Sequence, residues 1–412
     1  MTIRNGAMGV LLAACLAGTA ACTGSLGSAE PSVESAAAPP GAVETVTPPQ
    51  RDMAELQVLF WNEEERSARF RAMEDWFAGL EVSAASEPRA LPRGEPLAPE
   101  LATEIRALME ESGAAGAMVL EDGKVRFEEY GLGFGPEDRW TSFSVAKSFT
   151  STLLGAAVKD GFIASLDDPV TQYVPGLEGS AYDGVTIRQL ATMTSGVAWN
   201  EDYTDPQSDV ARMNEFVLEY GADAIVAQMK GLEREAEPGE TFVYKTGETN
   251  LLGLLVENAV GLSLAEYAQE KIVEPAGFAG PMFWMTDARG GNIGGCCLSL
   301  RLSDYVRMGQ FVFEGGVGVS GDRIVPDGWF AEAGAPKVDF GEDDPRRAGF
   351  GYGYQWWTYP EGNFGAQGIF GQSITILPEQ RIVVAVVSNW PAATGSYRGQ
   401  WFRQINRIAA AQ

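Results

Sequence analysis

Apolar residues recur along the chain with different spacings, and each spacing predicts a different kind of element. In residues 99–113 they return every three to four positions, which predicts an amphipathic helix that ends at a glycine. Residues 115–131 read as two strands joined by a tight turn at Asp122 and Gly123. A largely apolar run after this hairpin predicts a helix that ends near Gly161.

The rest of the chain predicts helices first and strands afterwards. Residues 166–285 read mostly as helices and loops, whereas strands are predicted in 351–360, 371–378 and 381–390, before a final helix in 399–412. Strands at both ends with helices between them indicate an α+β fold. We expect one antiparallel sheet, flanked by helices, that carries a mostly helical insertion.

Residues 1–22 have the pattern of an export signal. One positive charge, at Arg4, precedes an apolar run that is too short to span a bilayer stably, and small residues follow. The stretch resembles a bacterial lipoprotein signal with Cys22 as the lipidated residue; Cys15 fits that pattern better but leaves a very short apolar region. We expect an exported protein, periplasmic or anchored to a membrane by lipid, with plain secretion as the alternative.

Two further segments precede the expected compact domain. Residues 23–51 are rich in Pro, Ser, Ala and Gly and have little to bury, which predicts a disordered tether. Residues 52–98 start with helical periodicity, clearest in 53–80, and continue through a proline-rich stretch. We interpret them as an N-terminal helical extension of a compact domain in residues 99–412.

The amino-acid composition limits the partners that the protein can bind and the catalytic groups that it can use. The 412-residue chain has a formal net charge of −26 and no evident basic patch, so we exclude nucleic acid as a partner. It has no histidine, which excludes a Ser-His-Asp triad, a histidine general base and His-ligated zinc. Acid–base chemistry near neutral pH must then use a lysine, tyrosine or carboxylate with a shifted pKa. We expect no metal and no cofactor.

Cys296 and Cys297 are adjacent in the sequence. Neighbouring Cα atoms lie 3.8 Å apart across a trans peptide, which is closer than an ordinary disulfide prefers. We therefore expect two packed, free thiols.

Ser144 stands three residues before Lys147, at the expected start of the helix that ends near Gly161. Residues i and i+3 share a helix face, so the hydroxyl and the amine can touch. The helix start also offers free N–H groups to an oxyanion, and a desolvated lysine can accept a proton. By itself the pair is a weak signal, because a capping serine on an ordinary helix surface gives the same pattern.

Two longer stretches give the pair a context. They are TSFSVAKSFTSTLLGAAVKDGFIASLDDPVTQYVP, residues 141–175, and RQLATMTSGVAWNEDY, residues 188–203. Both resemble the serine beta-lactamase and penicillin-binding-protein superfamily, in the esterase-like branch related to class C. The greatest similarity is to 6-aminohexanoate-dimer hydrolases and neighbouring carboxylesterases, over roughly residues 60–405. The resemblance implies a beta-lactamase/transpeptidase-like fold and an acyl-enzyme on Ser144.

The second motif of this family is Tyr-x-Asn or Tyr-x-Ser, and GETFVYKTGETNLLG offers Tyr244 and Thr246 at its first and third positions. The resemblance implies that Tyr244 is the partner base and the acid for the leaving group. Thr246 departs from the motif but keeps a hydroxyl. Whether Lys147 or Tyr244 first takes the proton of Ser144 stays open here.

The third motif lies on a strand beside the site, and FGAQGIFGQSITILPEQ aligns with it. The resemblance implies that the backbone N–H groups of Ser144 and Ile369 form the oxyanion hole. Gly368 lets the strand approach the substrate closely. Ala366 stands where lactam-processing members carry a cation for the substrate carboxylate, so we expect esters or amides without that group.

Two further residues are candidate substrate contacts. Gln367 is one, because the alignment of the third motif could slip by a residue. Tyr203 resembles a site-facing tyrosine of the nylon-oligomer hydrolases, although a plain surface loop fits as well.

These features together predict a serine hydrolase for a small-molecule ester or amide, with no nucleic-acid partner. One alternative is a beta-lactamase or D,D-peptidase that acts on cell-wall peptides. Another, of a different class, is a non-catalytic, lipid-anchored binding or sensor protein that has kept the fold.

Overall fold

The computed structural model describes residues 43–220, 222–342 and 344–411, and these belong to one compact unit. The predicted signal segment and Cys22 lie outside the described residues. The α-helices are α1 (Glu63–Phe70), α2 (Pro99–Ser112), α3 (Ala146–Lys159), α4 (Val170–Tyr173), α5 (Ile187–Ala191), α6 (Asp209–Tyr220), α7 (Ala222–Lys230), α8 (Thr246–Val260), α9 (Leu264–Ala268), α10 (Glu274–Ala276), α11 (Leu302–Phe313), α12 (Trp329–Ala333) and α13 (Tyr397–Ala410).

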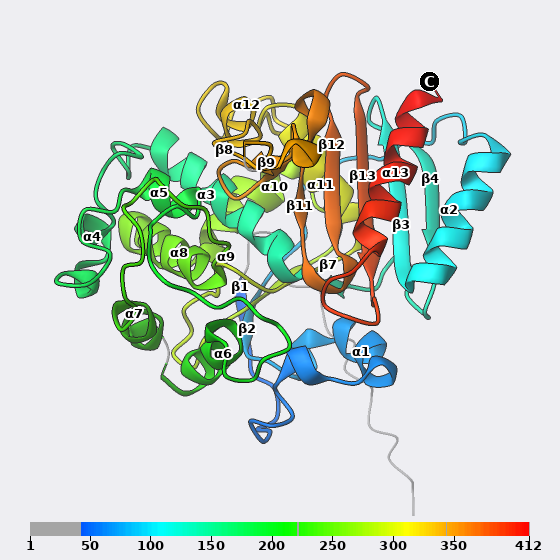
Figure 1. Cartoon of the computed structure of the whole chain (residues 1–412). Helices are drawn as coiled ribbons and strands as arrows, with labels where there is room; N and C mark the ends of the chain where they lie inside the picture. Colours follow the sequence, from blue (N-terminus) through cyan, green and yellow to red (C-terminus); the bar gives the residue numbers. More distant parts are fainter. Residues whose placement is uncertain (1–42, 221, 343, 412) are drawn as a thin grey trace, which may run out of the picture. The chain divides into compact units, whose positions relative to one another are not determined.

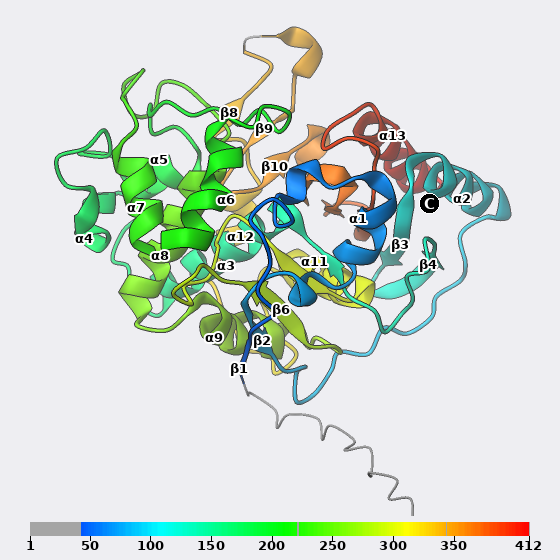
Figure 2. The same cartoon turned by 90° about the horizontal axis from the view of Figure 1, so that it is seen from below.

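The strands are β1 (Val43–Val46), β2 (Gly79–Val82), β3 (Ala114–Glu121), β4 (Lys124–Tyr130), β5 (Trp140–Thr141), β6 (Met282–Met285), β7 (Leu298–Leu300), β8 (Val338–Asp339), β9 (Gly351–Tyr352), β10 (Trp357–Thr358), β11 (Phe364–Gln367), β12 (Ser373–Leu377) and β13 (Ile382–Ser388). Figures 1 and 2 show helices α4–α9 on one side of the molecule and the larger sheet, with α2 and α13, on the other.

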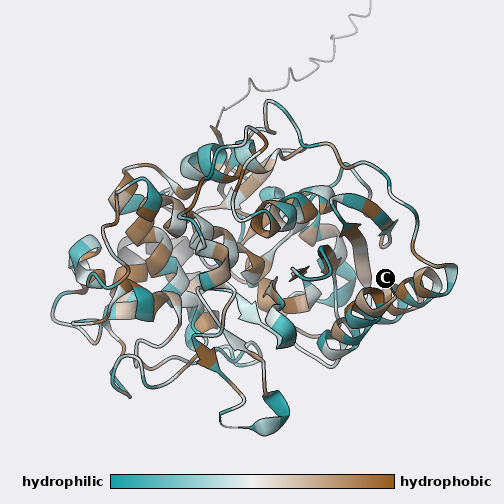
Figure 3. Cartoon of the chain, turned by 90° about the horizontal axis from the view of Figure 1, so that it is seen from above, coloured by the Kyte–Doolittle hydropathy of each residue, from teal (hydrophilic) through white to brown (hydrophobic). Residues whose placement is uncertain are grey.

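The larger sheet confirms the expected α+β fold. Within the described residues it has eight strands in the order β4-β3-β13-β12-β11-β10-β9-β8, and every neighbouring pair is antiparallel. In β13, Val383, Ala385 and Val387 face the main core, whereas Val384 and Val386 face the core under α2 and α13. The two helices beside the C-terminus in Figure 3 alternate hydrophobic and hydrophilic positions, as this one-sided packing requires.

A second sheet corrects the expectation of a single one. In the described residues its order is β1-β2-β6-β7-β5, so strands before the predicted domain pair with strands from its middle. Strand β6 is buried at all four positions and shows no alternation that a sequence pattern could reveal. Strand β1 lies inside the segment predicted as a disordered tether, so that prediction is wrong for Val43–Val46.

The segment before α2 is less helical than its periodicity predicts. Only residues 63–70 form an α-helix, which starts where the Asn62 side chain accepts a hydrogen bond from the Glu65 N–H. Short 3₁₀ turns at Val58–Phe60 and Met73–Asp75 flank it, and the chain then pairs as β2. Because β2 needs an extended backbone to join the second sheet, tertiary pairing ends the helical run.

Helices dominate residues 166–285, where α4–α10 precede β6. Among the described residues no single helix is long and apolar enough to cross a membrane, although one bent pair, residues 246–260 with 264–276, would pass by length and composition.

An aromatic cluster connects the N-terminal segment to two turns of the main domain. Phe70 of α1 is 0% exposed and packs on Phe143 and Phe370, at ring-centroid distances of 5.0 and 5.5 Å. Phe143 and Phe370 pack on each other at 5.4 Å. Both have positive φ, 43° and 56°, a strained conformation for a bulky residue. Their packing with Phe70 therefore has to hold both turns in place.

Phe70→Ala should lower the free energy of unfolding by about 3–5 kcal/mol, because it removes a fully buried ring from this cluster. Urea unfolding followed by tryptophan fluorescence measures the change. Phe60→Ala is the matched control: its ring is 45% exposed, and we expect a change within about 0.5 kcal/mol. Equal effects of the two substitutions would contradict this account of the cluster.

Candidate active site

Ser144 and Lys147 meet at the start of α3, as their spacing predicts. Ser144 lies in a short 3₁₀ turn, Phe143–Val145, that leads directly into the helix. Lys147 Nζ lies 3.0 Å from Ser144 Oγ, 3.0 Å from Thr246 Oγ1 and 2.8 Å from the Gly295 carbonyl oxygen. The amine is thus held at three points, one of which is the hydroxyl.

Lys147 is an unusual lysine because it is 1% exposed. Burial lowers its pKa to about 8, since the charged ammonium loses its water, and the negative charge of Glu201 opposes this change. The ammonium form still predominates at pH 7, but the neutral fraction is far larger than that of an ordinary lysine, and the neutral amine can act as a proton acceptor.

Tyr244 lies two residues before α8 and faces the same point. Its ring centroid is 5.2 Å from Lys147 Nζ, and the ring stacks on Trp357 at 5.4 Å. Desolvation raises the pKa of Tyr244 well above its usual value, the charge of Glu201 adds to the rise, and a hydrogen bond with Ser144 lowers it. Tyr244 is therefore a protonated phenol near neutral pH.

Glu201 is a site residue that sequence reasoning missed. Its Oε1 accepts hydrogen bonds from the Tyr203 hydroxyl, at 2.9 Å, and from the Thr246 hydroxyl. Its Oε2 accepts from the Thr246 N–H, at 2.9 Å, and from Trp199 Nε1. One carboxylate thereby ties the loop of Tyr203 to the first residue of α8. Glu201 stands in the same WNEDY stretch as Tyr203, but nothing in the spacing of that stretch marks the carboxylate as a site residue.

The backbone of Gly368 and Ile369 comes close to Ser144. A Cβ on Gly368 would lie 2.5 Å from the Ser142 carbonyl oxygen, so only glycine allows this approach. Among the hydrogen bonds of the described residues, none uses the backbone N–H of Ser144 or Ile369 as its donor. Both groups are thus available to a ligand.

Arg398 of α13 is a second residue that the sequence did not indicate. Its Nη2 donates to the Gly368 carbonyl at 2.7 Å and its Nη1 to the Gln372 carbonyl at 3.2 Å. The Gly368 carbonyl and the Ile369 N–H belong to one peptide unit, so this charge-assisted bond orients and polarises that N–H.

The charge of Arg398 also faces the cleft. No carboxylate of the described residues pairs with it, and desolvation lowers its pKa to about 10. Ala366, by contrast, is buried on β11 and 1% exposed. The third motif has no cation at Ala366, but the positively charged Arg398 lines the same cleft from α13. The strand motif could not indicate this positive charge, because Arg398 reaches the cleft from a distant helix. The expectation of esters or amides without a carboxylate stays a prediction.

The cleft beside Ser144 has a volume of about 410 Å³. Of the predicted substrate contacts, Tyr203, Gln367 and Gly368 line it, together with Glu201 and Arg398. Gln367 Nε2 donates to the Tyr359 hydroxyl at 2.7 Å. Thr246 lies behind the cleft and contacts Lys147 instead.

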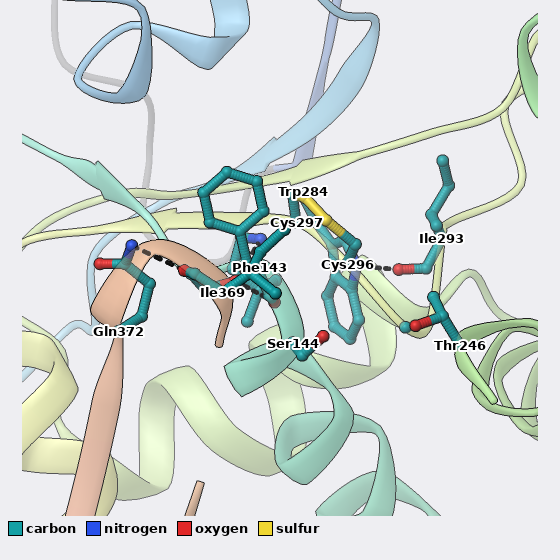
Figure 4. The surroundings of a disulfide bond; sticks show 12 residues. Phe143, Ser144, Thr246, Trp284, Ile293, Cys296, Cys297, Ile369 and Gln372 are labelled. Carbon is teal, nitrogen blue, oxygen red and sulfur yellow. Dashed lines mark hydrogen bonds between the residues drawn. A yellow bond between two sulfur atoms is a disulfide. The ribbon is translucent and has the colours of Figure 1, made fainter. Parts of the chain in front are cut away.

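Cys296 and Cys297 form a disulfide, so the expectation of free thiols was wrong. The two sulfurs pair although the Cα atoms, 3.2 Å apart, lie closer than an ordinary disulfide prefers, so the distance argument did not exclude the bond. Figure 4 shows the disulfide with Phe143, Ser144, Thr246 and Ile369 around it. In the described part of the chain, no group of three or more Cys, Asp or Glu gathers as a metal site would require.

Comparison with known proteins agrees with this architecture. The profile of the family named Beta-lactamase matches residues 101–406. A 6-aminohexanoate-dimer hydrolase from Paenarthrobacter ureafaciens is 30% identical over 295 residues, which cover 69% of this chain and 74% of that protein.

Solved structures show the same fold. A Bacillus anthracis protein provisionally named a 6-aminohexanoate-dimer hydrolase superposes with a TM-score of 0.75, at 20% identity, over 88% of this chain and 98% of its own. An octameric penicillin-binding protein homologue from Pyrococcus abyssi gives 0.60, at 23% identity, over 75% and 77%.

The fold and these relatives define a serine hydrolase of the beta-lactamase/transpeptidase-like class, not a protein without activity. The chain belongs to the beta-lactamase family.

The burial of Lys147 has a consequence that does not depend on catalysis. Because its pKa is about 8 in the folded state and about 10.4 in an unfolded chain, unfolding takes up a proton between these values. The free energy of unfolding should therefore rise from pH 8 towards pH 10, by up to roughly 3 kcal/mol from this group. Lys147→Met should flatten the rise, as measured by urea unfolding at several pH values.

Lys159→Met is the matched control, because Lys159 is an exposed lysine at the end of the same helix. It should keep the wild-type dependence on pH. If the curves of Lys147→Met and wild type run parallel between pH 8 and 10, the lysine does not titrate as its burial requires.

Proposed function

We propose that the protein hydrolyses a small-molecule ester or amide in two steps, through an acyl-enzyme on Ser144. The observation that carries the proposal is the contact of 3.0 Å between Ser144 Oγ and a buried Lys147 whose pKa is lowered to about 8. A neutral amine at this distance can remove the hydroxyl proton as oxygen attacks the carbonyl carbon.

The hydrogen bonds around Lys147 determine where its lone pair points. A neutral amine has two N–H groups and one lone pair. The Gly295 carbonyl can only accept, and the Thr246 hydroxyl already donates to Glu201, so each takes one N–H. The lone pair is then left for the proton of Ser144. Glu201 thus acts as a positioning residue, because it fixes the direction of the Thr246 hydroxyl.

Tyr244 is suited to the second proton transfer, in which the leaving group receives a proton. As a phenol with a raised pKa it is a poor first acceptor but a good donor. Lys147 therefore takes the proton of Ser144, and Tyr244 passes one to the leaving ester oxygen or amide nitrogen while Lys147 reprotonates it. In the second step water gives a proton to the same pair as its oxygen attacks the acyl carbon. Ser144 Oγ takes that proton back as its bond to the acyl carbon breaks, which restores the hydroxyl and the neutral amine. The proposal thus makes Lys147 the first proton acceptor and Tyr244 the proton donor.

The N–H groups of Ser144 and Ile369 would hold the negative oxygen of the tetrahedral intermediate. The approach of Gly368 to Ser142 and the bond from Arg398 to the Gly368 carbonyl both support this role. Each such donor contributes roughly 3–4 kcal/mol to transition-state stabilisation.

The substrate class follows from the cleft and from the relatives. A cleft of about 410 Å³ suits a small molecule. The Paenarthrobacter relative is named for hydrolysis of the 6-aminohexanoate dimer, which supports an amide among the substrates.

The alternative, a beta-lactamase or D,D-peptidase, is favoured by one observation: Arg398 offers an unpaired cation to a carboxylate-bearing substrate. Parallel assays with nitrocefin and neutral esters discriminate the two. Because Arg398 also holds the Gly368 carbonyl, Arg398→Ala should slow both reactions. A kcat/KM for nitrocefin that is far above that for the esters, and that falls much further than ester hydrolysis in Arg398→Ala, would establish the alternative.

Ser144→Ala should lower kcat for p-nitrophenyl butanoate by about 10³-fold or more. Tyr244→Phe should reduce anilide hydrolysis by about 10²–10⁴-fold, and ester hydrolysis less, since p-nitrophenolate leaves without a proton. Steady-state kinetics and labelling of Ser144 by a fluorophosphonate probe measure both. Unchanged ester hydrolysis by a folded Ser144→Ala variant would refute the proposal.

The rate should also depend on pH through Lys147. Its neutral form is the active one, so kcat/KM should rise with pH, with a midpoint of about 8. Glu201→Gln should move this midpoint to lower pH, because removal of the negative charge destabilises the ammonium form. Ester hydrolysis followed at the isosbestic wavelength of p-nitrophenol gives the profile. Asp202→Asn, an exposed neighbour, should leave the midpoint in place; a shift as large as that of Glu201→Gln would contradict the assignment.

A further inference from the structure

A second, narrower cavity opens from Ser144. It has a volume of about 50 Å³ and shares Ser144, Tyr203 and Ile369 with the main cleft, so the two spaces meet at the reactive hydroxyl. Its other walls are mostly apolar side chains from several separate stretches of the chain, among them Met213, Met285 and Ile293. No step of the proposed mechanism uses this space.

Part of its wall comes from the N-terminal segment. Val58, Leu59, Met73 and Phe77 line the cavity, and all of them precede the residues 101–406 that match the family profile. Leu59 is half-buried and packs against the core, whereas the next residue of the same 3₁₀ turn, Phe60, points to solvent. This wall of the cavity is therefore formed by the N-terminal segment and not by the residues that match the family profile.

The main cleft and the second cavity are lined by different side chains, and this difference indicates which part of a substrate each of them can bind. Tyr244, the proposed donor to the leaving group, lines the main cleft and is absent from the second cavity, and so is Arg398. The leaving group must lie within reach of Tyr244, so it occupies the main cleft. The acyl group, on the other side of the carbonyl carbon, is then directed towards the apolar cavity.

We propose that this second cavity is the acyl-binding pocket and that it selects short, unbranched aliphatic acyl groups. The inference rests on the proposed acyl-enzyme. One water-sized sphere occupies roughly 10–15 Å³ of such a volume, so the cavity holds about three to five methylene-sized groups. Attack by Ser144 Oγ on the carbonyl carbon, with departure of the leaving oxygen or nitrogen, leaves an acyl chain of about four or five carbons in place.

The closing experiment uses three esters with one leaving group: p-nitrophenyl acetate, butanoate and octanoate. The wild type should have its highest kcat/KM with butanoate. Leu59→Trp, which fills the cavity, should lower the ratio of butanoate to acetate by at least 10-fold. Leu59→Ala, which enlarges it, should raise the ratio of octanoate to butanoate by about 10-fold, the usual effect of one or two methylene contacts.

Phe60→Ala is the matched control, because it removes an exposed side chain from the same turn and should leave both ratios unchanged. Far-UV circular dichroism checks that each variant is folded. If both folded Leu59 variants keep the wild-type ratios, the assignment of the cavity as the acyl pocket is wrong. Hydrolysis that still depends on Ser144 would, in that case, leave the proposed function intact. If Ser144→Ala hydrolyses all three esters like wild type, the proposed function itself fails, and the acyl pocket fails with it.

Discussion

The geometry of the site depends on two phenylalanines with a left-handed backbone. Phe143 immediately precedes Ser144 and Phe370 immediately follows Ile369, and both have positive φ. Such a conformation costs of order 1–3 kcal/mol at each residue and persists only where the surroundings enforce it. The enforcing contact is aromatic: the two rings pack on each other, and Phe70 of α1 packs on both. The two N–H groups beside Ser144 are thus placed by residues that take no part in the chemistry.

This arrangement explains why the N-terminal segment belongs to the catalytic unit. The segment contributes β1 and β2 to the second sheet, Phe70 to the aromatic cluster and Leu59 to the cavity at Ser144. A second support comes from the opposite end of the chain, where Arg398 holds the carbonyl of the peptide that carries the Ile369 N–H. Distant parts of the chain therefore determine a geometry that the central motifs alone do not fix.

The same reasoning shows how far the sequence could lead. Ser144, Lys147 and Tyr244 could be named as candidates because they lie in short motifs with fixed spacing, and the structure brings them together. The larger sheet could be predicted because its strands alternate or form long apolar runs. Glu201 and Arg398 could not be found in this way, since their roles arise from loops and a helix that approach the site only in the folded chain. The second sheet was missed because its strands have only two to four residues, too few for a period to show.

The absence of histidine explains the remaining chemistry. A lysine can replace histidine as a base only if its pKa falls by more than two units, and burial provides this fall. Complete desolvation of the lysine would be unfavourable, because the proposed cycle includes a step in which Lys147 is a charged ammonium. The site has to stabilise that charge as well. The charge of Glu201 raises the pKa of Lys147 and so opposes the effect of burial. In the proposed mechanism, its hydrogen bond with the Thr246 hydroxyl also leaves the lone pair of Lys147 directed at Ser144. Under the proposed mechanism, one carboxylate would therefore both adjust the protonation of the base and fix its orientation, as the aspartate does for the imidazole in a histidine-based triad.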